Sequence, residues 1–124
     1  MYPDAPEVLS TLKDRNFKIA VVSSHPEKSL IKELRRYELT QYFDLVSGDP
    51  SPKNKRLKDV CNSLQVPRGE SFFVEDTIYG LRSGKDAGID CFGITTGYHS
   101  RERLEAEGTA IAVIGSLTEL LNFF

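Results

Sequence analysis

Short apolar runs alternate with longer amphipathic stretches along this 124-residue chain. The runs 19–22 and 72–74 are apolar throughout, which is typical of strands buried on both faces of a parallel sheet. In the stretches between such runs, apolar residues recur every three or four positions, as on the buried side of a surface helix. The strands that this pattern predicts are 18–22, 44–46, 71–74, 91–95 and 110–114.

Helix start signals fall between these strands. Asp4 and Ser116 are expected to cap the first and the last helix, and Glu119 would complete a capping box with Ser116. The other helices are expected to begin at Pro26, at Ser51-Pro52, after Thr77 and at Ser100. The alternation of strands and helices predicts one α/β domain with three layers, a mainly parallel sheet and right-handed crossovers.

Composition narrows the function classes. Sixteen basic and eighteen acidic residues give a net charge of −2, which indicates neither a nucleic-acid nor a membrane partner. The apolar runs are far shorter than the roughly 18 residues of a membrane span, and no signal-peptide pattern opens the chain. Cys61 and Cys91 lack metal-ligand spacing, so we expect buried free thiols of a cytoplasmic protein. His25 and His99 also lack ligand spacing and are expected at the surface or in caps.

Two adjacent carboxylates, Glu75 and Asp76, follow directly after the apolar run 72–74. Ligands of parallel sheets bind beyond the carboxyl ends of the strands, and no Lys or Arg adjoins this pair in the sequence. The pair is therefore a candidate cation site. The alternative is that Asp76 only caps the next helix, a role that Glu75 could not share because it belongs to the strand end.

A second candidate site lies after the strand 18–22. Ser23 and Ser24 stand between this strand and a helix, where hydroxyls and free backbone amides can bind phosphate oxygens. Alternatively, Ser24 or His25 merely caps the helix.

A third candidate is the basic first turn of the helix that begins at Ser51-Pro52. Lys53, Lys55 and Arg56 carry positive charge where the helix dipole disfavours it. A nearby anion would explain them, and so would a simple solvated basic face.

The ordered set Ser23, Lys53 and Glu75-Asp76 resembles the second, third and fourth motifs of the haloacid dehalogenase-like (HAD) hydrolase superfamily. The most specific part is VEDTIYGLRSGKDAGI at 74–89, which is similar to the VEDSxxGxxAGxxAG motif of β-phosphoglucomutase-like and phosphoglycolate phosphatase-like members. GITTGY at 93–98 is similar to the segment that follows it in phosphoglycolate phosphatases. Either Lys53 or Lys55 could be the third motif, and Lys53 fits the spacing to Leu64 better.

This resemblance implies a Rossmann-like core that transfers a phosphoryl group from a small phosphorylated metabolite with the help of Mg²⁺. It makes Ser23, Ser24 and Lys53 the phosphate-binding residues, of which Ser23 and Lys53 are also catalytic. Lys53 would neutralise the phosphoryl charge and hold the attacking aspartate. Glu75 and Asp76 would coordinate Mg²⁺ directly or through water, and hard oxygen ligands with retained waters suit that ion.

The chain departs from the family pattern at its start, because it contains no Asp-x-Asp motif. In the family this motif supplies the nucleophile and the general acid/base, on a strand between those that end at Ser23 and Asp76. The chain begins where the pattern resumes after that strand and the cap domain. Asp49, the nearest substitute, should lie away from Glu75-Asp76 in the sheet and lacks a second acid.

The missing central strand would leave two sheet edges facing a gap. Unpaired buried backbone groups cost about 1–3 kcal/mol each, which is large against the marginal stability of a domain. We therefore expect that the two strands close up, that a partner chain or a second copy supplies a strand, or that the chain is only marginally ordered.

Three functional interpretations follow. The chain could be the core of a phosphatase whose nucleophile segment is supplied separately, and would then be inactive alone. It could instead be a non-catalytic phosphate- and metal-binding or regulatory protein. A receiver-type phospho-acceptor domain also gathers acids, a hydroxyl and a lysine at strand ends, but there the acids come first in the chain.

Overall fold

The computed structural model describes residues 2–49, 51–95 and 99–124. Its strands are β1 (Ala20–Ser23), β2 (Leu45–Gly48), β3 (Phe72–Glu75), β4 (Asp90–Ile94) and β5 (Ala110–Ile114). Its α-helices are α1 (Ala5–Asp14), α2 (Glu27–Arg36), α3 (Lys53–Leu64), α4 (Ile78–Asp86) and α5 (Arg101–Glu107). Three 3₁₀ helices complete the described part, η1 (Thr40–Tyr42), η2 (Arg68–Glu70) and η3 (Leu117–Asn122).

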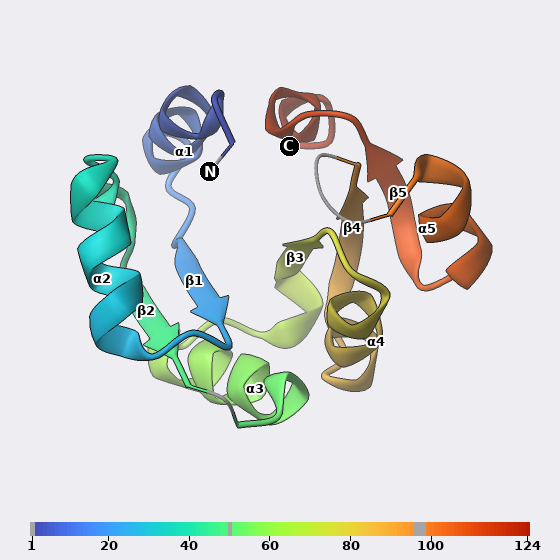
Figure 1. The fold of residues 1–124 in the computed structure, drawn as a ribbon, viewed down its shortest axis with the longest axis horizontal. Coiled ribbons are helices and arrows are strands. Elements are labelled where there is room, and N and C mark those ends of the chain that lie inside the picture. Colours follow the sequence, from blue (N-terminus) through green and yellow to red (C-terminus); the bar gives the residue numbers. More distant parts are fainter. Residues whose placement is uncertain (1, 50, 96–98) are drawn as a thin grey trace.

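The strands form two separate parallel sheets. β1 pairs with β2, and β3, β4 and β5 pair in that order, with β4 in the middle. β1 and β3 do not pair with each other, so the two sheets face a gap (Figure 1). The expectation that these strands close up is therefore wrong. Helices on both faces already fix the distance between the two sheets.

Helices cover both faces of the sheets, as the predicted three-layer fold requires. On one face α1 and η3 bury Val8, Leu12 and Leu120 against Phe92 and Ile94 of β4. On the other face α3, α4 and α5 contribute further buried residues, which are Leu57, Cys61, Leu81 and Leu104. α2 packs at the outer side through Leu30 and Leu34 against Val21 and Val46. The alternation of Cys91 and Phe92 between the two faces is that of a strand buried on both sides.

Contacts outside the sheets hold the two halves together. The ring of Phe17, just before β1, lies 6.0 Å from that of Phe72 at the start of β3, and Phe124 stacks on Phe72 at 4.2 Å. α1 reaches η3 through Asp4, whose Oδ2 accepts hydrogen bonds from the amide and hydroxyl of Thr118, both at 2.8 Å. The amino end of the gap is thus closed by aromatic rings and the α1–η3 face.

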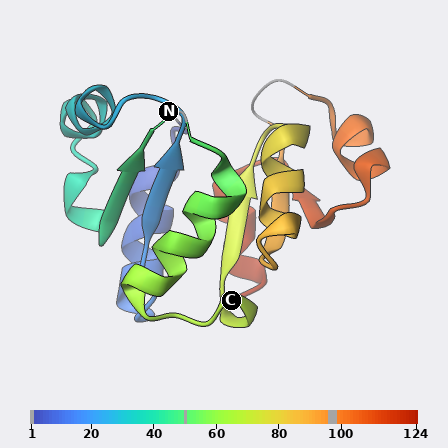
Figure 2. The same cartoon turned by 90° about the horizontal axis from the view of Figure 1, so that it is seen from below.

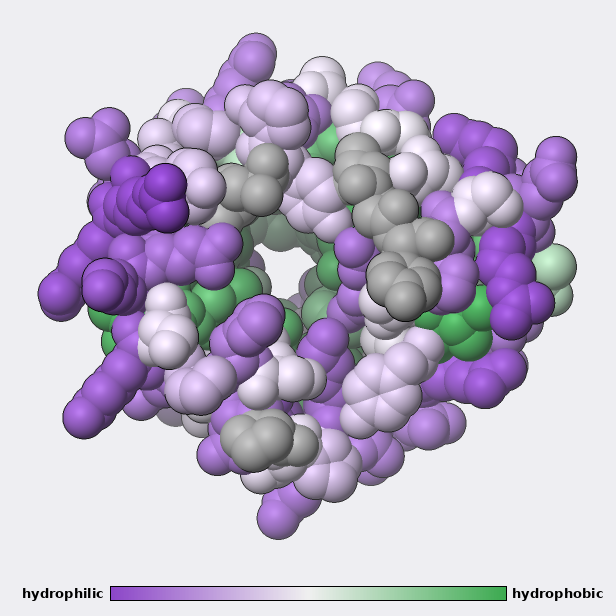
Figure 3. Space-filling view, viewed as in Figure 1, coloured by the Kyte–Doolittle hydropathy of each residue, from purple (hydrophilic) through white to green (hydrophobic). Residues whose placement is uncertain are grey.

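A cavity of about 520 Å³ remains between β1 and β3. Its walls are apolar residues of α1, β1, α3, β3 and η3. Figure 3 shows an opening at this place, with green apolar side chains at its margin. The carboxyl ends of β1, β2 and β3 lie along one edge of the molecule, the upper edge in Figure 2.

Two predicted caps are corrected by the structure. The side chain of Asp4 makes no capping bond to α1, because its carboxylate is engaged by Thr118. The last helix is a 3₁₀ helix without a bond from the Ser116 side chain, and Glu119 accepts instead from the amide of Gly115 at 2.6 Å. The start at Ser100 is confirmed, since its hydroxyl accepts from the amide of Arg103.

Two expectations from composition can be compared with the described residues. Cys61 and Cys91 are free and buried, as expected. No helix in the described ranges is long and apolar enough to span a bilayer.

Candidate active site

The predicted acidic pair lies at the carboxyl end of β3, and Lys53 lies against it. Lys53 Nζ is 3.0 Å from Glu75 Oε2, and the two side chains are only 12% and 8% exposed. Lys53 reaches this point because it is the first residue of α3, whose helix covers the gap beside β3. The structure thus joins a strand end and a helix start that are 22 residues apart in the chain.

The other oxygen of Glu75 is held by the turn that follows. Oε1 accepts hydrogen bonds from the amide of Asp76 at 3.1 Å and from the amide and hydroxyl of Thr77 at 3.3 and 3.2 Å. Thr77 Oγ1 in turn caps α4 by accepting from the amide of Gly80 at 3.0 Å. Asp76 therefore does not cap α4; Thr77 does.

Gly80 leaves the room that the Glu75 carboxyl group occupies. A Cβ at this position would come within 2.2 Å of Glu75 Oε2, so any larger residue would push the carboxylate off Lys53. The glycine of the motif is needed for close packing of helix against carboxylate, and its conformation is otherwise ordinary.

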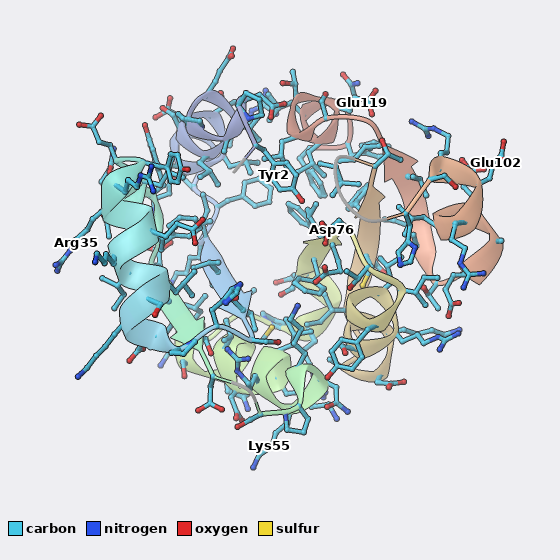
Figure 4. The ribbon with its side chains drawn as sticks, viewed as in Figure 1. Tyr2, Arg35, Lys55, Asp76, Glu102 and Glu119 are labelled. Atoms are coloured by element: carbon cyan, nitrogen blue, oxygen red, sulfur yellow. The ribbon has the colours of Figure 1, made fainter. Side chains whose placement is uncertain are left out.

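The two carboxyl groups are shifted in opposite directions. Burial raises the pKa of Glu75, but interactions with Asp76 and Lys53 outweigh burial and leave the pKa lowered. Burial, and then the neighbouring Glu75, raise the pKa of Asp76. Glu75 is therefore stabilised as an anion, whereas burial and the neighbouring Glu75 disfavour the charged form of Asp76 despite the nearby Lys53. In Figure 4 Asp76 lies at the margin of the central opening.

Ser23 lies at the carboxyl end of β1, on the same edge as Glu75 but across the gap. Its hydroxyl accepts from the amide of His25 at 3.2 Å, in a turn that leads to α2. Ser24 and His25 are exposed, and neither caps α2, which begins after Pro26 without a side-chain cap. The simple capping interpretation of Ser24 and His25 is therefore wrong, while their binding of phosphate stays a prediction.

The three basic residues of α3 have separate environments. Lys53 pairs with Glu75, and Lys55 is exposed and points outward in Figure 4. Arg56 is buried and donates to the carbonyl oxygens of Ser47 and Asp49 at 2.5 Å each. Of the two lysines, Lys53 is the one that contacts Glu75. The interpretation as a solvated basic face holds only for Lys55.

Asp49 is placed where the sheet order predicted. It follows β2, which is separated from β3 by β1 and the gap. Its Oδ1 accepts from the amide of Ser51 at 2.7 Å and from the Ser51 hydroxyl, and these bonds lower its pKa. Asp49 therefore holds the turn into α3 and does not replace the absent nucleophile.

Thr77 and Gly80 are site residues that the sequence pattern did not single out, and the buried bonds of Arg56 were not predicted. Arg56 belonged to a basic cluster for which a nearby anion or a solvated face was expected. Nothing in the sequence shows that the carbonyl oxygens of Ser47 and Asp49 need a donor. Thr77 and Gly80 were quoted only as parts of a motif. A Thr three residues before a Gly at a strand-to-helix junction was a usable capping signal.

The donor set suits Mg²⁺ only in part. Within the described ranges no group of three or more His, Cys, Asp or Glu residues gathers to hold a metal. Mg²⁺ is commonly bound by one or two carboxylates, with waters and substrate phosphate filling the other positions. Asp76 fits that need. Its raised pKa means that its negative charge is unfavourable at this place, and a bound cation would stabilise that charge.

Comparison with known proteins decides the family. The profile of the haloacid dehalogenase-like hydrolases matches residues 1–94 of the chain. The chain belongs to this family. The matched range includes β1, Lys53 and the Glu75-Asp76 turn.

Two curated relatives share the name phosphoglycolate phosphatase. Phosphoglycolate phosphatase of Vibrio parahaemolyticus is 32% identical over 98% of this chain and 55% of its own length. That of Pseudomonas fluorescens is 29% identical over 98% of this chain and 46% of its own length. The chain thus spans about half the length of the curated relatives that it matches.

Solved structures agree on the HAD fold. A predicted phosphatase from Clostridium acetobutylicum is 27% identical with a TM-score of 0.88, over 96% of this chain and 57% of that one. A haloacid dehalogenase-like hydrolase of Streptococcus pneumoniae has a TM-score of 0.89 at 16% identity, which shows the fold alone. It covers 99% of this chain and 59% of that one. The resemblance at 93–98 falls partly on 96–98, outside the described residues.

Proposed function

We propose that this chain forms the phosphate- and Mg²⁺-binding part of a HAD phosphatase that hydrolyses a small phosphate monoester. The observation that carries the proposal is the buried Lys53–Glu75 ion pair beside Asp76, at the carboxyl edge of a HAD-family sheet. The relatives' name makes 2-phosphoglycolate the first substrate to test.

The residues divide the work by charge. Lys53 presents an ammonium to the anionic phosphoryl group, and Glu75 fixes the position of that ammonium. The hydroxyl of Ser23 and the exposed Ser24 at the end of β1 would bind phosphoryl oxygens from the other side of the gap. Glu75 is committed to Lys53 and Thr77, so it would face the metal through water.

Mg²⁺ would be held chiefly by Asp76, where it would supply positive charge for the phosphoryl oxygens. The raised pKa of Asp76 and its place at the opening support this assignment. Waters and the substrate would complete the coordination, as this ion usually requires.

The chain alone is expected to bind but not to turn over substrate. Phosphoryl transfer in this family starts from an aspartate nucleophile, and the sequence holds no Asp-x-Asp motif. The same absence supports the second candidate, a non-catalytic phosphate- and metal-binding protein. The intact Lys53–Glu75 pair is compatible with both.

Binding and turnover can be measured separately. Titration calorimetry of the chain with Mg²⁺ and then with inorganic phosphate should detect both ligands. Binding should fall about tenfold or more in Lys53→Met and Asp76→Asn, as expected when a charge-assisted contact is lost. Lys55→Met is the matched control and should bind like the parent chain. Absence of Mg²⁺ and phosphate binding in the parent, or equal binding in all variants, would refute the proposal.

The choice between the two candidates needs an activity assay. With 2-phosphoglycolate and p-nitrophenyl phosphate, the chain alone should show no turnover above buffer. A fusion that adds a strand with Asp-x-Asp ahead of the chain should hydrolyse one of them, and Asp76→Asn should abolish that activity. A folded fusion that binds phosphate without turnover would favour the binding protein.

A further inference from the structure

Arg56 is a buried cation whose hydrogen bonds converge on the segment 47–49, at the carboxyl end of β2. We propose that Arg56 is a positioning residue of the candidate site. It fastens the first turn of α3 to the β1–β2 sheet and thereby sets the separation between Ser23 and Lys53. The inference rests on the proposed function, since it assumes that Ser23 and Lys53 bind the same phosphate group.

The guanidinium group of Arg56 binds the end of β2 through three nitrogens. The residue is only 6% exposed. Nη2 donates to the carbonyl oxygen of Ser47 at 2.5 Å and to the Ser47 hydroxyl at 2.9 Å, and Nε donates to the same hydroxyl at 3.3 Å. Nη1 donates to the carbonyl oxygen of Asp49 at 2.5 Å. A planar group with donors in fixed directions holds this geometry, which a single ammonium group cannot reproduce.

The segment 47–49 is also fixed to Ser23. The amide of Asp49 donates to the carbonyl oxygen of Ser23 at 3.1 Å, and Gly48 is the partner of Ser23 in the β1–β2 ladder. A Cβ at Gly48 would come within 2.6 Å of the carbonyl oxygen of His25, so the chain after Ser23 packs directly on this segment. A shift of the segment 47–49 would therefore move Ser23 with it.

The first turn of α3 connects this segment to the other sheet. Lys53, the first residue of α3, binds Glu75 at the end of β3 at 3.0 Å, and Arg56 binds β2 from three residues further along the helix. α3 contacts β1, β2 and α4, and Figure 1 shows it crossing the gap between the sheets. Since β1 and β3 do not pair in the described chain, their ladders do not fix Ser23 relative to Lys53. Arg56 supplies this link on the β1–β2 side.

A positioning role and a purely structural role predict different effects on ligand binding. If Arg56 only contributes stability, its replacement should lower the free energy of unfolding and leave the affinities of the folded protein unchanged. If Arg56 positions the site, phosphate should bind more weakly, because the Ser23 hydroxyl and the Lys53 ammonium group lose the separation that suits one phosphate. The Mg²⁺ affinity should stay unchanged, because Asp76 follows β3 on the other sheet.

Two variants of Arg56 separate these roles. Arg56→Lys keeps the charge and removes the planar fork, and Arg56→Ala removes both. Arg68→Ala is the matched control, because it also removes a bond from an arginine to a carbonyl oxygen, that of Ala87 at 3.2 Å, but ahead of β3 and outside the site. Urea unfolding identifies conditions in which each variant is folded, and titration calorimetry then measures inorganic phosphate and Mg²⁺ separately. Both Arg56 variants should bind phosphate about tenfold or more weakly with unchanged Mg²⁺ affinity, and the control should bind both ligands like the parent chain.

Two further measurements test the link to Ser23. Ser23→Ala should weaken phosphate binding in the parent chain, but it should cost little more in Arg56→Ala, where the hydroxyl is already out of place. Millimolar guanidinium should restore part of the phosphate affinity of Arg56→Ala and none of that of Ser23→Ala. Sodium chloride at the same concentration is the control for ionic strength.

The outcomes distinguish this inference from the proposed function. Phosphate binding by either folded Arg56 variant that equals that of the parent would overturn the inference and leave the proposed function standing. The inference would also be overturned if the losses of Arg56→Ala and Ser23→Ala multiplied in the double variant, or if Mg²⁺ binding weakened as much as phosphate binding. If Arg56→Ala does not fold, Arg56→Lys carries the same comparison. A parent chain that binds no phosphate would refute the proposed function and this inference with it.

Discussion

At the residue scale, the site is organised around the carboxyl group of Glu75. One oxygen binds Lys53, and the other collects the Thr77 hydroxyl and two backbone amides. A buried carboxylate that is hydrogen-bonded on both oxygens is tolerated, whereas an unpaired one is costly. Lys53 therefore has a structural role in addition to the proposed chemical one.

Replacement of Lys53 by Met should destabilise the fold. The methionine keeps the apolar stem but leaves Glu75 without its cation, and loss of one partner from so buried a pair costs about 3–5 kcal/mol. Lys55→Met, two residues along the same helix, should change stability by less than about 0.5 kcal/mol because Lys55 is exposed. Urea unfolding at pH 7 measures both. Equal stabilities of the two variants would contradict the assigned ion pair.

Asp76→Asn should stabilise the metal-free chain at neutral pH. The pKa of Asp76 is raised in the folded chain above its value near 3.8 in the unfolded chain. The protonated form of Asp76 therefore stabilises the fold below about pH 3.8, and this contribution to stability is lost as the pH rises through the folded-state pKa. Removal of the charge should add about 0.5–1 kcal/mol at pH 7, since solvent screens part of the repulsion from Glu75. The gain should shrink as the pH falls toward 4. Thermal unfolding in EDTA measures it, with the exposed Asp90→Asn as control.

Mg²⁺ should reverse the order of these two proteins. At ten times its dissociation constant, a ligand adds about 1.4 kcal/mol to the folded state that binds it. The parent chain should gain this increment, and Asp76→Asn should not. A variant that gains as much as the parent would remove Asp76 from the metal site.

Single residues differ in how far the sequence alone could place them. The apolar run before Glu75-Asp76 was enough to put both at a strand end, and the motif spacing brought Lys53 near them. The buried bonds of Arg56 were not predictable, because their acceptors are carbonyls of β2 and Asp49 that local sequence does not mark. The clash that excludes a side chain at Gly80 likewise depends on the rotamer of Glu75.

At the element scale, the strands and helices follow the predicted order with shifted ends. The predicted strand 110–114 is confirmed in full, while β1 and β2 begin one or two residues later than the apolar pattern indicates. Apolar periodicity reports burial, and backbone pairing decides where a strand stops. The first and last helices differ most from the prediction at their caps. Asp4 and Thr118 are 114 residues apart in the chain, and capping rules, which use only neighbouring residues, do not include such a contact.

Asp4→Ala should loosen the contact between α1 and η3. It removes two hydrogen bonds to Thr118 and the only side-chain acceptor that the structure shows for the Thr118 amide, a loss of about 1–2 kcal/mol. Burial raises the pKa of Asp4, but the Thr118 bonds outweigh it and lower the pKa. The contribution of the Asp4 carboxylate to stability is therefore present above pH 3.8, the pKa of Asp4 in the unfolded chain, and is lost as the pH falls below it.

The control for this variant lies on the same helix. Asp14 is exposed at the end of α1, and Asp14→Ala should have a small effect at any pH. Urea unfolding at pH 7 and pH 4 should show a larger loss for Asp4→Ala at pH 7 and a smaller one at pH 4. A loss that does not change with pH would mean that the Asp4 charge contributes nothing.

At the scale of the whole molecule, two half-sheets are held apart by shared helical layers. The layers α1–η3 and α3–α4 bridge the gap from both faces, and the aromatic contacts of Phe17, Phe72 and Phe124 close one end. The family resemblance and the absence of Asp-x-Asp together predicted that a central strand is missing, but left open whether the two flanking strands close up. That the gap stays open was not predictable, because it depends on the packing of helices against both faces of the two sheets.

This architecture predicts uneven protection of the strands. β4 is paired on both sides and buries Phe92 and Ile94 completely, so its amides should exchange only through global unfolding. β1 and β3 each have one unpaired edge on a cavity of about 520 Å³. Their amides that face the cavity should exchange by local opening, about tenfold or more faster than those of β4.

Amide exchange followed by NMR at several low urea concentrations separates the two routes. The exchange rates of the β4 amides should depend on urea as strongly as global unfolding does. The exchange rates of the β1 and β3 amides that face the cavity should depend on urea only weakly, because local opening exposes little new surface. β5, which is paired only with β4, is the internal comparison for an ordinary outer strand. Protection in β1 and β3 equal to that in β4 would mean that the two half-sheets close over the gap in solution.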